Sequence, residues 1–214
     1  EGGIAMDRPM VRAPVAFPNT GLLSADRAYI GDRIGRLWRM DLRNRDPERW
    51  TMSVAWPPQD AEEGEPYQTG RPIVGRPSLS LRADGKLVVV FGTGEESVQP
   101  ANRSYLVSLV DDVVLGNDDE TLDFQTRKNW VMPLRAGEFL SGSTVVRDEV
   151  VYFTTIQEVV GQACGVSQGR LYGVDYVRTQ ETFETDDDRT LNIVPALPTL
   201  TTTLGGTIVD AIAI

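Results

Sequence analysis

The sequence predicts an all-β fold, a section of a β-propeller made of antiparallel four-stranded blades. One phrase returns along the 214 residues with a nearly constant step, which is typical of repeat proteins. Each copy is rich in Val, Ile, Leu and Tyr and is divided by Gly, Asp and Asn, as expected of strands joined by hairpins. No copy shows the 3.6-residue apolar period of an amphipathic helix.

Three full copies of the phrase are present, and a fourth begins. The opening positions Pro14, Pro77 and Ser143 follow one another at steps of 63 and 66 residues. Residues 141–146 are echoed by residues 204–209, so the sequence holds about three and a half repeats. Because propeller blades usually have about 40 to 50 residues, the surplus is expected in loops. We therefore predict a single partial propeller domain over residues 1–214, with repeat units at about 11–75, 76–140 and 141–203 and the start of a further unit at 204–214.

Local patterns within the repeats add further expectations. The run from Leu87 to Phe91 is apolar at consecutive positions, which indicates a strand covered on both faces. Residues 31–35 are expected to form a β-turn whose glycines adopt positive φ. Trp38 lies inside a repeat strand and is assigned to the core. Insertion loops are expected at residues 56–70, 111–129 and 178–204, which are polar, acidic or rich in proline and threonine.

Composition excludes several classes of function. A net charge of −10 argues against nucleic acid, because binding to phosphates needs clustered Lys and Arg. The chain has no histidine, which argues against Ser-His-Asp chemistry and zinc hydrolysis. Its one cysteine, Cys164, has no internal disulfide partner. The longest apolar runs are far shorter than a membrane span. Since the chain starts at Glu1 without a signal-peptide pattern, we interpret it as a processed or excised segment.

Two acidic clusters are candidate calcium sites, because calcium takes six to eight oxygen ligands from closely spaced carboxylates and amides. Neither cluster has the Gly and Glu spacing of an EF-hand loop, so a solvated acidic loop and a protein contact surface stay open as alternatives. No catalytic or cofactor-binding residue is assigned, and no pair of carboxylates is selected for glycoside hydrolysis. The candidate calcium ligands are Asn117, Asp119 and Asp123 in the first cluster and Asp186, Asp188 and Asn192 in the second.

Three motifs, in order, resemble the C-terminal propeller of the PilY family. Residues 29–42 read YIGDRIGRLWRMDL, close to that family's tyrosine-valine-glycine-aspartate phrase followed by glycine, leucine-tryptophan-arginine and aspartate-leucine. Residues 90–94 read VFGTG, as in the same family. Cys164, followed by the GRLYGVD of residues 169–175, is similar to a later pattern. The resemblance covers about residues 11–176.

The resemblance implies a non-enzymatic, secreted or surface-exposed bacterial factor at the tip of a type IV pilus. Such a factor promotes pilus assembly, motility or adhesion. Its partners would be pilus or minor pilin proteins, or the remaining part of the same propeller. Some members of the family hold calcium in a loop of alternating aspartates and asparagine, but neither acidic cluster of this chain has that order.

Two other functions stay open. The first is a propeller enzyme similar to the pyrroloquinoline-quinone dehydrogenases, whose repeated docking motif is alanine-aspartate-glycine-lysine-tryptophan. Residues 83–87 match it once and only in part, since Leu87 replaces the tryptophan. The second is a generic scaffold propeller that binds proteins through its loops.

Overall fold

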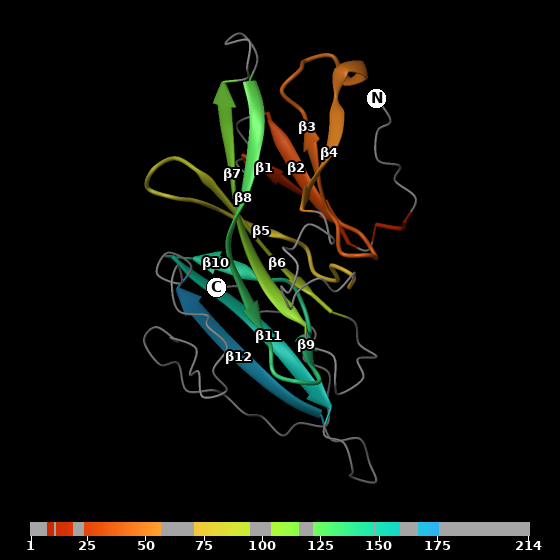
Figure 1. Cartoon of the computed structure of the whole chain (residues 1–214), viewed down its shortest axis with the longest axis vertical. Helices are drawn as coiled ribbons and strands as arrows, with labels where there is room; N and C mark the ends of the chain where they lie inside the picture. The colour runs from red at the N-terminus through yellow and green to blue at the C-terminus, as the bar shows by residue number, and fades with distance from the viewer. Residues whose placement is uncertain are drawn as a thin grey trace, which may run out of the picture.

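The computed structural model describes residues 8–10, 12–18, 24–56, 71–94, 104–115, 122–147, 149–158 and 167–175. Within these ranges the chain is all-β, and its strands form three antiparallel four-stranded sheets, as the sequence predicts (Figure 1). The first sheet has the order β1-β2-β3-β4. Its strands are β1 (Val15–Phe17), β2 (Arg27–Gly31), β3 (Leu37–Asp41) and β4 (Thr51–Trp56), and the 3-10 helix η1 (Pro47–Arg49) lies between β3 and β4.

The second sheet repeats this order with β5-β6-β7-β8. In the third sheet, β12 pairs with β11 along its whole length, and β9 and β10 both pair with β11 as well. These two short strands therefore share the other edge of β11. The strands are β5 (Ser78–Leu81), β6 (Leu87–Thr93), β7 (Tyr105–Leu115) and β8 (Leu122–Pro133), then β9 (Glu138–Leu140), β10 (Val145–Arg147), β11 (Val150–Glu158) and β12 (Ser167–Asp175).

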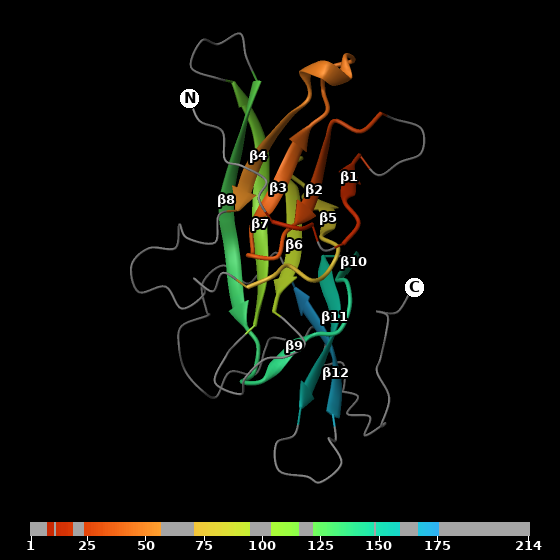
Figure 2. The same cartoon turned by 90° about the vertical axis from the view of Figure 1, so that its right-hand side faces the viewer.

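Strand register shows the repeat directly. Val15 pairs with Tyr29, Ser78 with Val90, and Val145 with Tyr152, so equivalent positions on the first strands lie 63 and 67 residues apart. The first strands also lie side by side, because β5 contacts both β1 and β10. Figure 2 shows these three strands following one another along one side of the molecule.

The second sheet is packed between the other two. On β6, Val89 and Phe91 belong to a core shared with the first sheet, whereas Val88 and Val90 belong to a core shared with the third. All seven residues of β6 are buried. The expectation that the consecutive apolar run from Leu87 to Phe91 is covered on both faces is therefore confirmed. A three-layer stack with two hydrophobic interfaces results.

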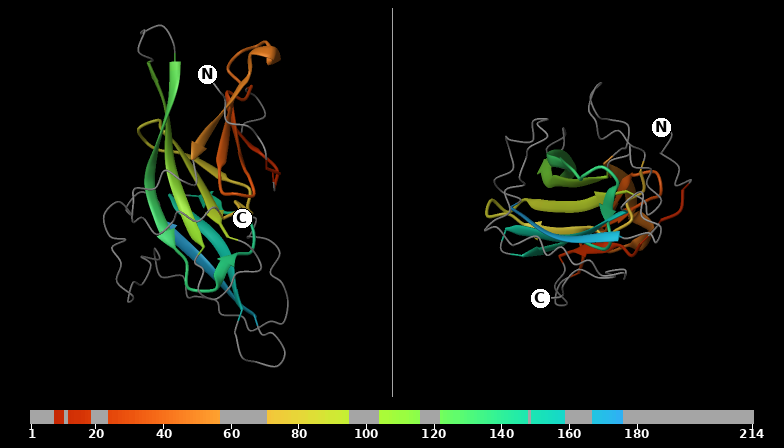
Figure 3. Two further views of the ribbon diagram at one scale, coloured as in Figure 1. Left: turned by 45° about the vertical axis from the view of Figure 1, so that its right-hand side comes forward. Right: turned by 90° about the horizontal axis from the view of Figure 1, so that it is seen from below.

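The predicted insertion loop at residues 111–129 is wrong. Residues 111–115 belong to β7 and residues 122–129 to β8, and the two strands form a long hairpin arm that rises beside the first sheet (Figure 3). Its sequence is polar because alternate residues of β8 face solvent, and Asp123, Gln125 and Arg127 are exposed. Of the loop expected at residues 56–70, Trp56 is instead the last residue of β4, and the rest lies outside the described residues, as does the loop expected at residues 178–204.

The β2–β3 hairpin is held by one buried carboxylate. Asp32 Oδ1 accepts hydrogen bonds from the backbone N–H groups of Ile34 and Arg36, both at 2.9 Å. Asp32 Oδ2 accepts from Arg36 Nε at 2.8 Å and from Trp38 Nε1 at 2.9 Å. Asp32 is fully buried and Trp38 is 2% exposed, so the assignment of Trp38 to the core is confirmed. The aspartate, arginine and tryptophan of the YIGDRIGRLW phrase thus act as one structural unit.

The two glycines of this phrase have different roles. Gly35 has φ +90°, as expected for the turn. Gly31 has no positive φ, and the expectation for that residue is wrong: a Cβ placed there would lie 2.4 Å from Cβ of Ile73. Gly92 in the second sheet is similar, since its Cβ would meet the side chain of Leu140 at 2.4 Å. In both places a strand residue lacks a side chain so that a residue near the start of the next repeat can pack against it: Ile73 lies before β5, and Leu140 lies in β9.

Among the described residues, the only helical segment is η1, and no helix has the length and apolar character of a membrane span.

Replacing Gly31 with Ala should lower the free energy of unfolding by about 3 kcal/mol, because the new methyl group would overlap Ile73. Gly85→Ala is a matched control at a turn with φ +81° and no atom within 4 Å of the new Cβ, so only the backbone cost of about 1 kcal/mol is expected. Urea denaturation of both variants measures the difference. Equal losses would contradict the role given to Gly31.

Candidate functional site

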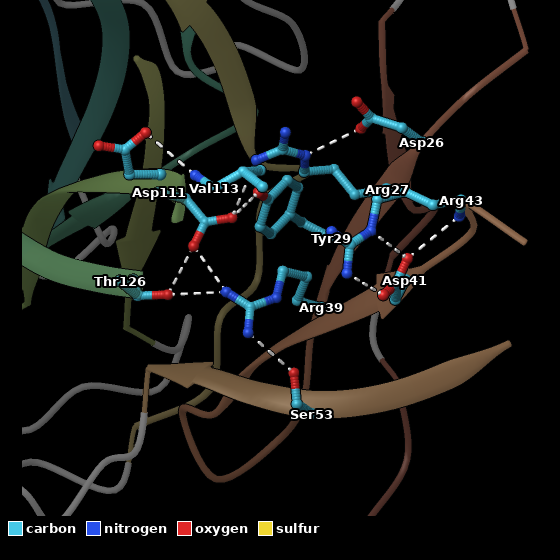
Figure 4. Close-up of polar contacts among 11 residues, drawn as sticks. Asp26, Arg27, Tyr29, Arg39, Asp41, Arg43, Ser53, Asp111, Val113 and Thr126 are labelled. Atoms are coloured by element: carbon cyan, nitrogen blue, oxygen red, sulfur yellow. Dashed lines mark hydrogen bonds and ion pairs between the residues drawn. The ribbon is translucent and has the colours of Figure 1, made fainter. Parts of the chain in front are cut away.

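The most concentrated polar site of the described residues lies between the first sheet and the β7–β8 arm. Asp111 of β7 meets Arg27 and Tyr29 of β2, Arg39 of β3 and Thr126 of β8 (Figure 4). We name these five residues the Asp111 cluster. Asp111 is 1% exposed, and Tyr29 is fully buried. Alternation along β2 places Arg27 on the same face as Tyr29, which is the face that packs on the second sheet.

The carboxylate of Asp111 accepts four hydrogen bonds, its full complement. Oδ1 accepts from Arg39 Nη1 and from Thr126 Oγ1, both at 2.6 Å. Oδ2 accepts from the Tyr29 hydroxyl at 2.5 Å and from Arg27 Nη1 at 3.4 Å. The hydroxyl of Thr126 also accepts from Arg39 Nη1, at 2.9 Å. Burial of the charge is thereby compensated by two cations and two hydroxyl donors.

One aromatic ring organises the arginines around this cluster. The guanidinium carbons of Arg27, Arg39 and Arg43 lie 4.9, 4.2 and 4.3 Å from the centre of the Phe124 ring. Such cation–π contacts strengthen when the groups are desolvated. Arg43 is also paired with Asp41 at 2.5 Å. Phe124 comes from β8, so the arm supplies both the anion and the ring that hold the arginines of the first sheet.

A second buried cluster lies within the third sheet. Glu138 of β9 is fully buried, and its Oε1 accepts hydrogen bonds from Thr155 Oγ1 at 2.5 Å, Tyr172 at 2.8 Å and Arg170 at 3.2 Å. Its Oε2 accepts from the backbone N–H of Arg135 at 3.0 Å. We name Glu138, Thr155, Arg170 and Tyr172 the Glu138 cluster. It fastens β9 to β11 and β12 as the Asp111 cluster fastens the arm to the first sheet.

Both clusters shift the ionisation of a tyrosine. Burial raises the pKa of the Tyr29 phenol far above its usual value, and the negative charge of Asp111 adds to the effect. Burial likewise raises the pKa of Tyr172, with a contribution from Glu138. Each phenol is therefore held neutral as a hydrogen-bond donor to the carboxylate beside it.

The hydrogen bonds and ion pairs of these two clusters hold neighbouring strands together. A general base or nucleophile needs a free lone pair facing its substrate. In Asp111 and Glu138 the carboxylate oxygens face donors from neighbouring strands, and neither residue is more than 1% exposed. Neither cluster was predicted from the sequence. For the Asp111 cluster, a sequence signal was present: alternation along β2 places Arg27 on the same inward face as Tyr29, so a buried arginine there needs an anion.

Of the candidate calcium ligands, only Asp123 lies within the described residues. It is exposed on β8, one residue before Phe124, whose ring faces the arginines. Within the part of the chain that the structure describes, no three acidic or thiol side chains gather as a metal site. Asn117, Asp119, Asp186, Asp188 and Asn192 lie outside it, so the calcium hypothesis for those residues stays a prediction.

The other tryptophans do not share one surface. Trp130 is 4% exposed in the core between the second and third sheets. Trp56 packs against the core between the first and second sheets, with its ring centre 6.5 Å from that of Phe91. Trp50 is 44% exposed, and its indole N–H donates to the carbonyl of Asn44. These described rings therefore do not form a common face for a planar cofactor.

Comparison with known proteins adds no relative. The chain matches no protein-family model and no curated protein sequence.

Removing the charge of Asp111 should destabilise the protein strongly. Asp111→Asn leaves Arg39 buried without an anion and should cost about 3 kcal/mol or more of unfolding free energy. Its neighbour offers a matched control: Asp112 pairs with Lys86 at 2.6 Å with both side chains partly exposed, so Asp112→Asn should cost at most about 1 kcal/mol. Urea denaturation measures the unfolding free energy of both variants. Similar losses in the two would contradict the stabilising role given to the Asp111 cluster.

Alkaline pH should unfold the protein as the two tyrosines are forced to ionise. The unfolded phenols release their protons near pH 10, whereas Tyr29 and Tyr172 hold theirs in the native state. The native state thus binds more protons above that pH, and stability falls as pH rises. Tyrosinate absorbance should rise together with unfolding. The slope of stability against pH should be smaller in Tyr29→Phe, and an unchanged slope would contradict the assignment.

Proposed function

We propose that this chain is a section of a non-enzymatic β-propeller at a bacterial cell surface, acting in the assembly, motility or adhesion of type IV pili. The observation that carries the proposal is the β2–β3 hairpin. The motif that resembles the PilY propeller most closely is the segment in which Asp32 binds Arg36 and Trp38 and in which Gly31 admits Ile73. Its distinctive residues thus have a common structural reason to occur together.

The arrangement of the sheets supports the propeller part of the proposal. In a propeller, four-stranded antiparallel sheets stack face to face around an axis, and their first strands lie nearest to it. The second sheet packs between its two neighbours, and β5 contacts both β1 and β10. The register steps of 63 and 67 residues fit one blade to each repeat.

The buried carboxylates support a binding role rather than catalysis. Asp111 and Glu138 are occupied by donors of neighbouring strands, so they stabilise the scaffold. A scaffold of this kind offers its edges and loops to other proteins. The partners proposed are pilus or minor pilin proteins, or the remaining part of the same propeller.

Deletion of the gene that encodes this chain tests the pilus role. Fewer surface pili by electron microscopy and reduced twitching are expected, with recovery when the wild-type gene is restored. Asp32→Asn should restore poorly, because it weakens the hairpin, whereas Asp84→Asn, at an exposed turn, should restore fully. Normal piliation and twitching in the deletion strain would show that the pilus role is wrong.

The alternative of a quinone enzyme is tested separately. The purified chain is mixed with pyrroloquinoline quinone and calcium, and the visible absorbance of the quinone is followed. We expect an unchanged spectrum and no reduction of a dye acceptor when alcohols or sugars are added. A saturable spectral change together with dye reduction would favour the dehydrogenase.

A further inference from the structure

The two interfaces of the stack follow one rule. We call the face that a sheet turns toward the following sheet its forward face, and the opposite face, which in the second and third sheets contacts the preceding sheet, its rear face. The forward face of the first sheet includes Tyr29 and Leu37, and these pack on Val89, Phe91 and Val107 of the second sheet's rear face. The second sheet's forward face then packs on the rear face of the third, through Val88, Val90, Leu106, Val110, Phe153, Tyr172 and Val174.

The rear face of the first sheet is apolar although no described strand covers it. Strand register places its residues in two rows that cross the sheet. An antiparallel sheet with one solvated face normally carries polar residues there. In the view of Figure 2 this sheet lies in front of the others, with no labelled strand over it. The rows are Ala16, Ala28, Met40 and Met52, then Ile30, Trp38 and Val54; Ala28 and Trp38 are buried, and the other five are half-buried.

Matching positions in the strand pairing of the first and second sheets show what this face is suited to bind. Tyr29 pairs with Val15 and Arg39, just as Val90 pairs with Ser78 and Ser108. Ile30 therefore has the position of Phe91, and Met40 that of Leu109. Phe91 and Leu109 are residues with which the second sheet binds the sheet before it. The rear face of the first sheet is thus an interface half of the same type.

The third sheet offers the complementary half. Tyr152 pairs with Val145, as Tyr29 pairs with Val15, and it points away from the rear-face residues Val151 and Phe153. Tyr152, Val145 and Leu171 are half-buried on this forward face. Among the described strands, both ends of the stack therefore carry an apolar half of one repeated interface that no other described sheet covers.

We propose that a second copy of this chain docks head to tail, with the forward face of the third sheet of one copy on the rear face of the first sheet of the other. A second copy fits these faces because the contact would repeat the two interfaces already present within the chain. Such a heterologous contact either closes a ring or extends into a filament. The inference rests on the propeller part of the proposed function and not on its pilus part.

Sedimentation velocity of the purified chain, over about a hundredfold range of concentration, tests the proposal. Assemblies of two or more copies should form as concentration rises. Met40→Glu on the first sheet and Tyr152→Glu on the third should each give monomers. An equimolar mixture of the two variants should associate one to one, because each retains the face that the other lacks. This mixed complex should bind more weakly than any wild-type ring, because it contains a single interface.

Two controls keep the outcome decisive. Leu81→Glu replaces an apolar side chain that is 56% exposed on β5 and should leave association unchanged. Met52→Glu on the edge strand β4 repeats the Met40 test at a position less deep in the sheet, and circular dichroism verifies that each variant is folded. A wild-type chain that stays monomeric, a mixture that fails to associate while the wild type does, or loss of association in Leu81→Glu would each overturn the proposal. The cell assays of the pilus role fail or succeed independently of these results.

Discussion

Burial of the second sheet on both faces is the constraint on which the rest of the structure depends. Val88 to Phe91 can be apolar at every position only because a sheet lies on each side of β6. The need to cover both faces sets the distance between repeats along the sequence. It also sets which alternate residues of the neighbouring strands point toward β6. The same need explains Gly92, since β9 of the third sheet must come close to β6, which is packed between two layers; Gly31 on β2 leaves similar room for Ile73, which precedes the second sheet. Hydrophobic stacking therefore sets the architecture, and the turn motifs adapt to it.

The Asp111 and Glu138 clusters fix the relative positions of strands that apolar packing between the sheets would leave free to shift. The β7–β8 arm reaches beyond the apolar interface, and there Asp111 and Phe124 meet the arginines of the first sheet. Hydrogen bonds between charged groups have strict geometry, so they fix relative positions that apolar contact leaves variable. Glu138 fixes β9 on β11 and β12 in the same manner. The result is an apolar stack whose layers are aligned by ionic contacts at their margins.

The all-β class with antiparallel four-stranded sheets, the repeat, the core position of Trp38 and the two-sided burial of β6 could be predicted, because all of them follow from local patterns. The arm was not predicted, because its polar and acidic composition was interpreted as a loop, although Asp123, Gln125 and Arg127 alternate with more buried residues as in a half-buried strand. The Asp111 cluster joins residues more than seventy positions apart, and only the stacking of the sheets brings them together. The phrase DDETLDF at residues 118–124 is nearly repeated as DDRTLNI at residues 187–193, so the two candidate calcium clusters occupy similar positions in the sequence repeat.

The two-sided cover of β6 also sets the order in which parts of the molecule open. The backbone amides of β6 are paired with β5 and β7 and are shielded by a sheet on each side, so their protons can reach water only when the layers separate. β4 pairs with β3 along one edge and lies on the partly exposed side of the first sheet, so its amides open by local fraying. Hydrogen exchange would therefore divide the chain into a slow central layer and fast outer strands. The centre of the stack would be the last part to lose its structure.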